Sequence, residues 1–315
     1  MEQVTQIKVE LSQPAVRLDA YLCTQLPQVS RGAVQRMLEE GSILVDGKPS
    51  KTTHHPRAGE VIDIRWPTAR PTQLQPEDIE LEVLFEDADL LVINKRADMV
   101  VHPAAGNRDG TLLNALLHYA PELASVPRAG LVHRIDKDTT GLLVVARTLV
   151  AHKLLVEQLQ ARLFEREYEA VVAGVMTGGS TVEGAMARHP RDRVRMAVTA
   201  TGKPAITHYR VLQRFRAHTH VQVKLETGRT HQIRVHMAHI HHPVIGDPVY
   251  GGRARIPAGC SPALAEALRH FKRQALHAAR LGLEHPLSGE HMAWAAPLPA
   301  DMQTLLAVLR EDIPA

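Results

Sequence analysis

Residues 131–145 read LVHRIDKDTTGLLVV, a short polar loop between two apolar runs. The apolar runs at 131–132 and 142–145 are typical of buried strands. The loop carries Arg134 and Asp136, and burying a guanidinium and a carboxylate costs several kcal/mol unless a partner or a ligand compensates the charge. The stretch therefore predicts a site where chemistry occurs; the alternative is a structural Arg–Asp pair at a strand end.

The length and composition narrow the class of protein. A chain of 315 residues, 44% of them hydrophobic, predicts about two domains with a sizeable core. No apolar run reaches the roughly 18–20 residues that span a bilayer, and the N-terminal sequence MEQVTQIKVELSQ has no signal-peptide pattern. Cys23 and Cys260 are too few for a disulfide framework or a cysteine zinc site. We expect a cytoplasmic protein.

Positive charge is concentrated in one part of the chain. Residues 186–236 contain eleven Lys or Arg residues and two acidic residues. Such a run repels itself unless it is solvated or faces a polyanion, so it predicts binding to a phosphate backbone, with a solvated basic face as the alternative. Aromatic residues are only 3% of the chain, which disfavours broad base-stacking surfaces. The candidate RNA contacts in this run are Arg188, Arg191, Arg193 and Arg195.

The chain begins with a compact module at residues 14–65. Ser30 is a candidate N-cap for a helix whose apolar face carries Val34, Met37 and Leu38. Strands are expected at 43–48, ending in an Asp-Gly turn, and at 61–64. The sequence RWPTARPTQLQP follows, and the proline-rich segment 66–77 is expected to be a semi-rigid linker.

Residues 78–312 form the second expected domain. Its strands outnumber its helices and lack regular crossovers, so the sequence predicts an α+β fold with a mixed, largely antiparallel sheet. Strands are expected at 90–95, 168–173 and 221–225, and helices at 111–119, 148–163, 233–240 and from 262 onward.

Three polar clusters interrupt these apolar elements: HRID at 133–136, REYEA at 166–170 and ETGRTHQIRVH at 226–236. Together they supply a carboxylate, a phenol and several guanidiniums from separate parts of the chain. Active sites are commonly assembled in this way.

These motifs carry a resemblance to a known family. HRIDKDTTGLLVVA resembles the catalytic motif of the RluA family of pseudouridine synthases, and REYEAVVAG and LETGRTHQIRVH resemble its two downstream motifs, in the family's order. VRLDAYL, SRGAVQRMLEEGSILVDGK and AGEVIDI resemble the small S4-like α/β RNA-binding domain that precedes many members. RHPRDRVRMAV, HMAHIHHPVIGDPVYGG and RQALHA are similar to members that act on large-subunit ribosomal RNA. The resemblance covers about residues 12–312.

The resemblance implies isomerisation of specific uridines to pseudouridine in 23S ribosomal RNA, in helix 69, without a cofactor or a metal. It assigns the catalytic carboxylate to Asp136, which attacks the ribose or the base or removes a ribose proton. It pairs Arg229 with that carboxylate, places Arg134 in the space left by the flipped base, and stacks Tyr168 on the uracil. Ile233 is expected to line the base pocket.

The implied partner is 23S ribosomal RNA or a precursor of the large subunit, and we expect a monomer. In the S4-like module, phosphate contacts are expected from Arg17, Arg31, Arg36 and Lys48.

Two other functions remain open from the residues. One is a non-enzymatic RNA-binding assembly factor on a synthase fold. The other is a metal-dependent phosphoesterase that uses His133, Asp136 and Asp138. Five histidines between 231 and 242 also suggest a metal, but they lack the motif context of a zinc site.

Overall fold

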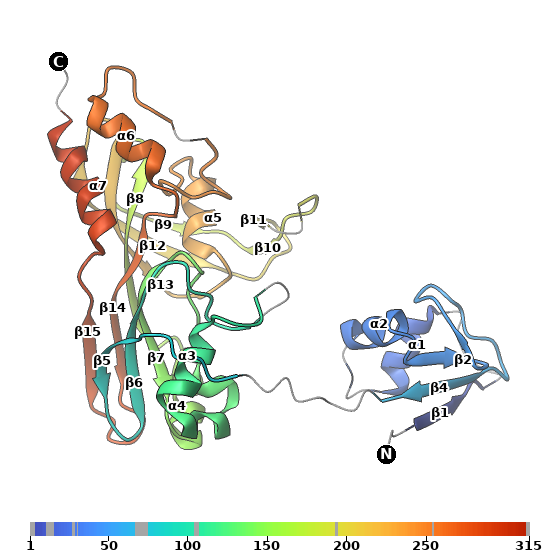
Figure 1. Cartoon of the computed structure of the whole chain (residues 1–315). Helices are drawn as coiled ribbons and strands as arrows, with labels where there is room; N and C mark the ends of the chain where they lie inside the picture. The colour runs from blue at the N-terminus through green and yellow to red at the C-terminus, as the bar shows by residue number, and fades with distance from the viewer. Residues whose placement is uncertain are drawn as a thin grey trace. The chain divides into compact units, whose positions relative to one another are not determined.

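The computed structural model describes residues 4–10, 16–26, 29, 31–66, 75–103, 107–192, 195–253 and 255–312. The chain divides into two compact units, Met1–Leu74 and Gln75–Ala315, which are described separately (Figure 1). Most of the expected linker, at 67–74, lies outside the described residues. In the part of the chain that is described, no helix is long and apolar enough to cross a membrane.

The N-terminal unit packs two helices with an antiparallel sheet of strand order β1-β4-β2-β3. Val34, Met37 and Leu38 are buried on one side of α2, as their spacing predicts, whereas the expected cap Ser30 lies outside the described residues. The elements are β1 (Val4–Lys8), α1 (Leu18–Gln25), α2 (Arg31–Glu39), β2 (Ile43–Val45), β3 (Lys48–Pro49) and β4 (Val61–Arg65).

The hairpin between β2 and β3 confirms the expected Asp-Gly turn. Asp46 and Gly47 both have left-handed φ angles, 48° and 75°, and connect two antiparallel strands. Two consecutive residues with positive φ produce the twist of a tight hairpin, which asparagine, aspartate and glycine tolerate best.

The second unit is built on a nine-stranded sheet of order β5-β6-β7-β14-β8-β13-β12-β9, with β15 paired to β14. Among its described strand pairs only β7 and β14 run parallel, which confirms the predicted mixed, largely antiparallel sheet. The strands are β5 (Glu82–Glu86), β6 (Leu90–Lys95), β7 (Thr140–Ala146), β8 (Glu165–Ala173), β9 (Ser180–Glu183), β12 (Ile206–Arg214), β13 (His218–Leu225), β14 (Leu276–Glu284) and β15 (His291–Ala295).

Apolar side chains cover both faces of this sheet. On β6, Leu90 and Val92 pack in one cluster with Ala151 and Leu155 of α4, whereas the alternate residues pack with α3, α5, α6 and α7 on the other face. A strand buried on both faces reads as the continuous apolar run seen in the sequence. The helices are α3 (Leu112–Tyr119), α4 (Leu149–Gln160), α5 (Gln232–His239), α6 (Pro262–His270) and α7 (Ala300–Glu311), with short 3-10 helices η1 (Pro121–Ser125) and η2 (Pro127–Gly130).

The helices expected at 111–119, 148–163, 233–240 and from 262 onward are present as α3, α4, α5 and α6. The side chains of Thr111, Thr148 and Ser261 each accept a backbone N–H in the first turn of α3, α4 and α6. A two-stranded arm, β10 (Met186–Arg188) and β11 (Met196–Val198), extends from the unit and carries part of the basic run (Figure 1).

Candidate active site

The polar loop of residues 131–139 leads directly into β7. Only the second of its flanking apolar runs is a strand; the prediction of a strand at 131–132 is wrong, since Leu131 forms only an isolated bridge with Val145. The preceding residues Arg128, Ala129 and Gly130 have left-handed φ angles of 55°, 49° and 78°, so the chain turns sharply there. A Cβ on Gly130 would overlap the backbone of β7, so this turn requires glycine.

Lys95, at the end of β6, holds the polar loop from behind. It is 2% exposed, and its ammonium donates to the carbonyls of Lys137 (2.8 Å), Met99 (3.0 Å) and Arg96 (2.8 Å). Burial lowers the pKa of Lys95 to about 7, although nearby carboxylates oppose this. Three backbone carbonyls therefore take the place of the water molecules that solvate the ammonium of an exposed lysine.

The segment before β14 fixes the other end of the loop. Arg273 donates to the carbonyl of Asp138 (3.2 Å) and is itself held by Asp301, while Gln274 donates to the hydroxyl of Thr139 (3.1 Å). The loop is thus positioned by side chains from distant parts of the chain.

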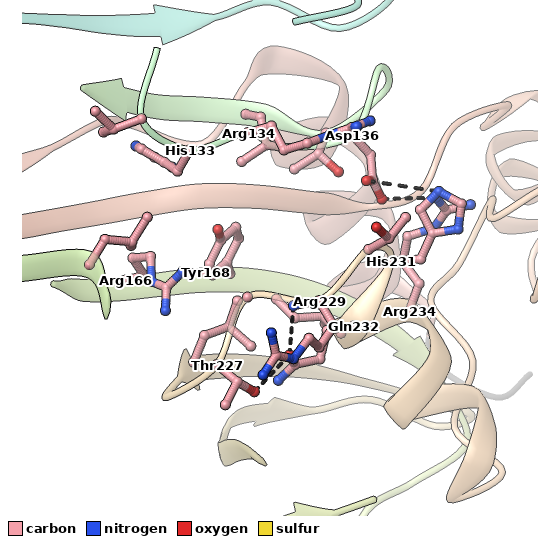
Figure 2. Close-up of a pocket in the computed structure, with 18 of the residues that line it drawn as sticks. His133, Arg134, Asp136, Arg166, Tyr168, Thr227, Arg229, His231, Gln232 and Arg234 are labelled. Atoms are coloured by element: carbon pink, nitrogen blue, oxygen red, sulfur yellow. Dashed lines mark hydrogen bonds and ion pairs between the residues drawn. The ribbon is translucent and has the colours of Figure 1, made fainter. Parts of the chain in front are cut away.

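Asp136 is paired with Arg234. Arg234 Nη1 donates to Asp136 Oδ2 over 2.9 Å (Figure 2). The other edge of the guanidinium donates to both oxygens of Asp247, at 2.7 and 2.9 Å. The side chains of Asp247 and Arg234 are 0% and 5% exposed, against 17% for Asp136. Burial alone would lower the pKa of Arg234, but the two carboxylates outweigh it and raise the pKa. Asp136 is the one member of this group that reaches the solvent.

The predicted pair between Arg229 and Asp136 is therefore wrong. Arg229 lies in the turn before α5, where its Nε donates to the carbonyl of Pro204 (3.2 Å). Arg234 lies on the first turns of α5, and the helix directs it toward the polar loop. Both arginines belong to the same motif, and only the turn and helix geometry distinguishes them.

The turn before α5 is organised by Gln232, which the sequence did not single out. Its carbonyl accepts from the Thr227 hydroxyl (2.8 Å) and the Arg229 N–H (3.0 Å), and its amide donates to Ile206 and Thr207 of β12. All of its hydrogen-bonding capacity is used internally, so it anchors the start of α5 to the sheet.

His231 precedes this helix with a left-handed φ of 57°. Its Nδ1 lies 2.8 Å from the hydroxyl of Tyr250, and its Nε2 is 3.9 Å from Asp136. Burial lowers the pKa of His231, while Asp136 opposes the shift. The Tyr250 ring also lies against Arg234, at 5.1 Å.

Tyr168 and Ile233 are both buried and line the same pocket. Burial raises the pKa of Tyr168 above that of a free phenol, and the nearby Arg166 partly offsets the effect. The phenol is therefore protonated at neutral pH. His133, also in the pocket lining, accepts the N–H of Val144 through Nε2 (3.2 Å), and burial lowers its pKa to about 3.

Asp136, Tyr168 and Ile233 line a pocket of about 560 Å³. It brings together the three polar clusters of the sequence, from the loop before β7, from β8 and from the turn into α5 (Figure 2). Arg134 is exposed beside the pocket and free to meet a ligand, as the resemblance implies. The lining includes His133, Arg134, Asp136, Arg166, Tyr168, Thr227, Arg229, His231, Gln232, Ile233 and Arg234.

Besides His231, two of the clustered histidines have structural partners. His236 contacts Thr207 and the carbonyl of Gly184, and His242 contacts the carbonyl of Ala173. Within the described ranges, the only three residues that could share a metal ion are Asp87, Asp89 and His285, and they do not line this pocket. The His133–Asp136–Asp138 grouping is not assembled, because His133 is engaged by β7.

The predicted RNA contacts of the N-terminal unit differ in their surroundings. Arg17 and Arg31 are about half exposed and both pair with the buried Asp19, at 3.2 and 2.9 Å. Lys48 is exposed at the tip of the hairpin. The side chain of Arg36 lies outside what the structure describes.

On the β10–β11 arm, Arg188 and Arg191 are exposed, and Arg195 stacks on Tyr250 at 5.2 Å. Arg193 lies outside the described residues. The arm thus links the basic run to the aromatic ring that contacts His231 and Arg234.

Sequence reasoning missed four residues of this site besides Gln232. Arg234 stood inside a quoted motif, and Asp247 inside another, GDPVYGG, but neither spacing reveals that they form an ion pair. The only sequence feature that marks Lys95 is a charge at the end of an apolar strand. The only one that marks Arg166 is its position two residues before Tyr168.

Comparison with known proteins agrees with this geometry. A sequence profile described as RNA pseudouridylate synthase matches residues 89–239, and one described as S4 domain matches residues 16–62. The chain is 52% identical to the Ribosomal large subunit pseudouridine synthase D of Escherichia coli, over 99% of this chain and 97% of that protein. It is 53% identical to the protein of the same name from Pseudomonas aeruginosa, over 94% and 92%.

Solved structures give the same result for the fold. Human RNA Pseudouridylate Synthase Domain Containing 4 matches with a TM-score of 0.58 at 25% identity, covering 74% of this chain and 95% of that one. Human RNA Pseudouridylate Synthase Domain Containing 1 matches with a TM-score of 0.56, also at 25% identity, covering 76% and 97%.

Proposed function

Because the chain belongs to the RNA pseudouridylate synthase family, RluA type, we propose that it converts specific uridines of large-subunit ribosomal RNA to pseudouridine, with Asp136 as the catalytic carboxylate. The observation that supports this most strongly is the pairing of Asp136 with the buried ion pair of Arg234 and Asp247 at a pocket of about 560 Å³. The bacterial relatives are named for the large ribosomal subunit. A ribosomal RNA substrate places the proposed reaction in the cytoplasm.

The reaction needs a flipped base, because a stacked uridine cannot reach a pocket of this kind. Arg134 is exposed next to the pocket, in reach of the space that the base leaves. Tyr168 and Ile233 offer an aromatic and an aliphatic surface for the uracil. Since the phenol is protonated, its first contribution is contact with the ring and a hydrogen bond.

Asp136 needs to be ionised whichever of its routes is followed, as a nucleophile toward ribose or base or as a base toward a ribose proton. Arg234 supplies a positive charge 2.9 Å from one oxygen of this carboxylate, and Asp247 fixes the orientation of that guanidinium. Asp136 still has one oxygen that the guanidinium does not contact, and this oxygen is available to the substrate.

The target within the ribosomal RNA is proposed by resemblance to be helix 69. The S4-like unit and the β10–β11 arm contribute exposed positive charge for its phosphates, including Lys48, Arg188 and Arg191.

The decisive experiment is release of tritium from carbon 5 of uridine in ribosomal RNA from cells that lack the enzyme. Wild-type protein is expected to release tritium, and Asp136→Asn to release none while binding the RNA with unchanged affinity. Release by both proteins would show that Asp136 is not the catalytic group. No release from free RNA or large-subunit particles would favour the alternative, a non-enzymatic RNA-binding assembly factor.

A further inference from the structure

Arg166 is a buried arginine whose charge is not balanced by any described carboxylate. It is 8% exposed, its Nη2 donates to the backbone carbonyl of Glu226 at 3.4 Å, and its Nε is buried without a partner. Arg234, equally buried, is held by two carboxylates. An unpaired buried guanidinium costs several kcal/mol, so a ligand of the pocket is the natural candidate for the missing partner.

The strand geometry directs Arg166 to the substrate site. Arg166 and Tyr168 are two residues apart on β8, so both side chains lie on the same face of the sheet, and both line the pocket with Asp136 (Figure 2). Gly228 leaves room for the guanidinium, because a Cβ there would lie 2.7 Å from Arg166 Nη1. A side chain at position 228 would therefore displace the guanidinium of Arg166.

Arg166 differs from exposed arginines that can contact the RNA phosphates, because its side chain is buried. When a base flips, its phosphodiester stays near the mouth of the pocket and only the base enters. Arg162, at the rim, is exposed and pairs with Glu226 at 3.5 Å. The buried Arg166 therefore meets the base, whose only strong acceptors are its carbonyl oxygens.

We propose that Arg166 is a catalytic residue of the isomerisation, whose guanidinium donates to a carbonyl oxygen of the flipped uracil and stabilises the negative charge that the ring acquires. This inference rests on the proposed function. It concerns the same reaction but adds a group that acts on the base, whereas Asp136 and Arg234 form a separate charged pair.

The charge on the ring follows from the chemistry. If the glycosidic bond breaks first, its electron pair goes to nitrogen 1 and spreads over both carbonyl oxygens. If Asp136 instead adds to carbon 6, the pair moves to the enolate oxygen at position 4. In the second route the glycosidic bond breaks next, with its electron pair on nitrogen 1. In either route carbon 5 then bonds to carbon 1′ of the ribose and loses its proton, and nitrogen 1 gains one. Any bond that Asp136 formed to the ribose or to carbon 6 breaks with its electron pair returning to the carboxylate, so the product is an isomer. A preorganised donor in a site shielded from water stabilises such charge strongly.

The test compares Arg166→Gln and Arg166→Lys with Arg280→Gln, a matched control on an exposed arginine of β14 that does not line the pocket. Single-turnover tritium release is measured along with RNA affinity and thermal unfolding. Arg166→Gln is expected to lower the rate constant of the bound complex about 100-fold to 1,000-fold. RNA affinity is expected to stay unchanged, and Arg166→Lys to retain part of the rate.

A second readout separates this role from a structural one. With 5-fluorouridine at the target position, the uracil anion is intrinsically more stable, so the rate of the first step with Arg166→Gln is expected to recover relative to wild type. A folded Arg166→Gln enzyme with a wild-type rate, or one whose loss lies only in RNA affinity, would overturn the inference. An equal deficit on uridine and 5-fluorouridine would also overturn it. If wild type itself releases no tritium, the proposed function fails instead.

Discussion

The guanidinium of Arg234 donates to the carboxylate of Asp136 over 2.9 Å, and this contact joins the polar loop before β7 to the first turns of α5. The two residues are 98 positions apart in the chain, so the pair exists only when the sheet is complete. The counter-ion of the proposed catalytic group is therefore in place only in the folded protein.

We expect Arg234→Met to lower the rate of tritium release at least about 100-fold, since Asp136 loses its counter-charge. It also leaves the buried carboxylate of Asp247 without its counter-charge, which costs about 3–5 kcal/mol of the free energy of unfolding. Arg229→Met removes only a hydrogen bond to the Pro204 carbonyl and is expected to cost at most about 1.5 kcal/mol. Urea unfolding and single-turnover rates check both; a larger effect at Arg229 would contradict the assigned pair.

Lys95→Met is expected to reduce both stability and activity, although Lys95 does not line the pocket. The substitution removes the ammonium donor from the carbonyls of Arg96, Met99 and Lys137, and a buried acceptor left unsatisfied costs about 1–3 kcal/mol. The loop that carries Asp136 then loses its anchor at Lys137. Urea unfolding with rate measurements checks this, with Lys153→Met on the exposed face of α4 as the control.

Acid stability is expected to depend on His133. Its pKa in the folded protein, about 3, is below the value of about 6.5 of a free histidine, so the unfolded chain binds a proton more readily. The stabilisation from keeping the ring neutral is complete above pH 6.5 and is lost as the pH falls toward 3. His133→Gln retains an acceptor for the Val144 N–H but does not titrate.

The free energy of unfolding of wild type should therefore fall more steeply than that of His133→Gln between about pH 6.5 and pH 4. Denaturant titrations at several pH values measure the two slopes. Parallel curves would show that His133 is not held neutral by the fold.

In the S4-like unit, the double variant Arg31→Gln and Lys48→Gln is expected to weaken RNA binding and flatten its salt dependence by about one unit of slope per lost phosphate contact. Arg31 is half exposed despite its pair with Asp19. Binding isotherms across a salt series check this against Lys153→Gln, a neutralised exposed lysine elsewhere. An unchanged slope would rule out phosphate contacts from these two side chains.

Much of the fold could be predicted because its signals are local. The helices α3, α4 and α6 and the Asp46-Gly47 turn are recognised from a few neighbouring residues, and each is confirmed. The strand at 90–95 was evident because burial on both faces makes it continuously apolar. The strand predicted at 131–132 was wrong, because two apolar residues do not show whether the backbone hydrogen bonds of a strand continue beyond them.

The site was predicted as three motifs and not as a set of contacts. The motifs predicted that Asp136, Tyr168 and Ile233 share one pocket, and all three line it in the structure. It could not separate Arg229 from Arg234, because the direction of each side chain depends on where the turn ends and α5 begins.

The sequence by itself determined the family, the order of the elements and the residue types available for chemistry, because these depend on local pattern and on motifs in register. Only the tertiary structure decided which charges pair and which remain unpaired. Asp247 joins Arg234, and Arg166 is left without a described carboxylate, because strand register and helix direction set distances between side chains far apart in the chain. Charge interactions fall off over a few ångströms, so such distances decide the chemistry.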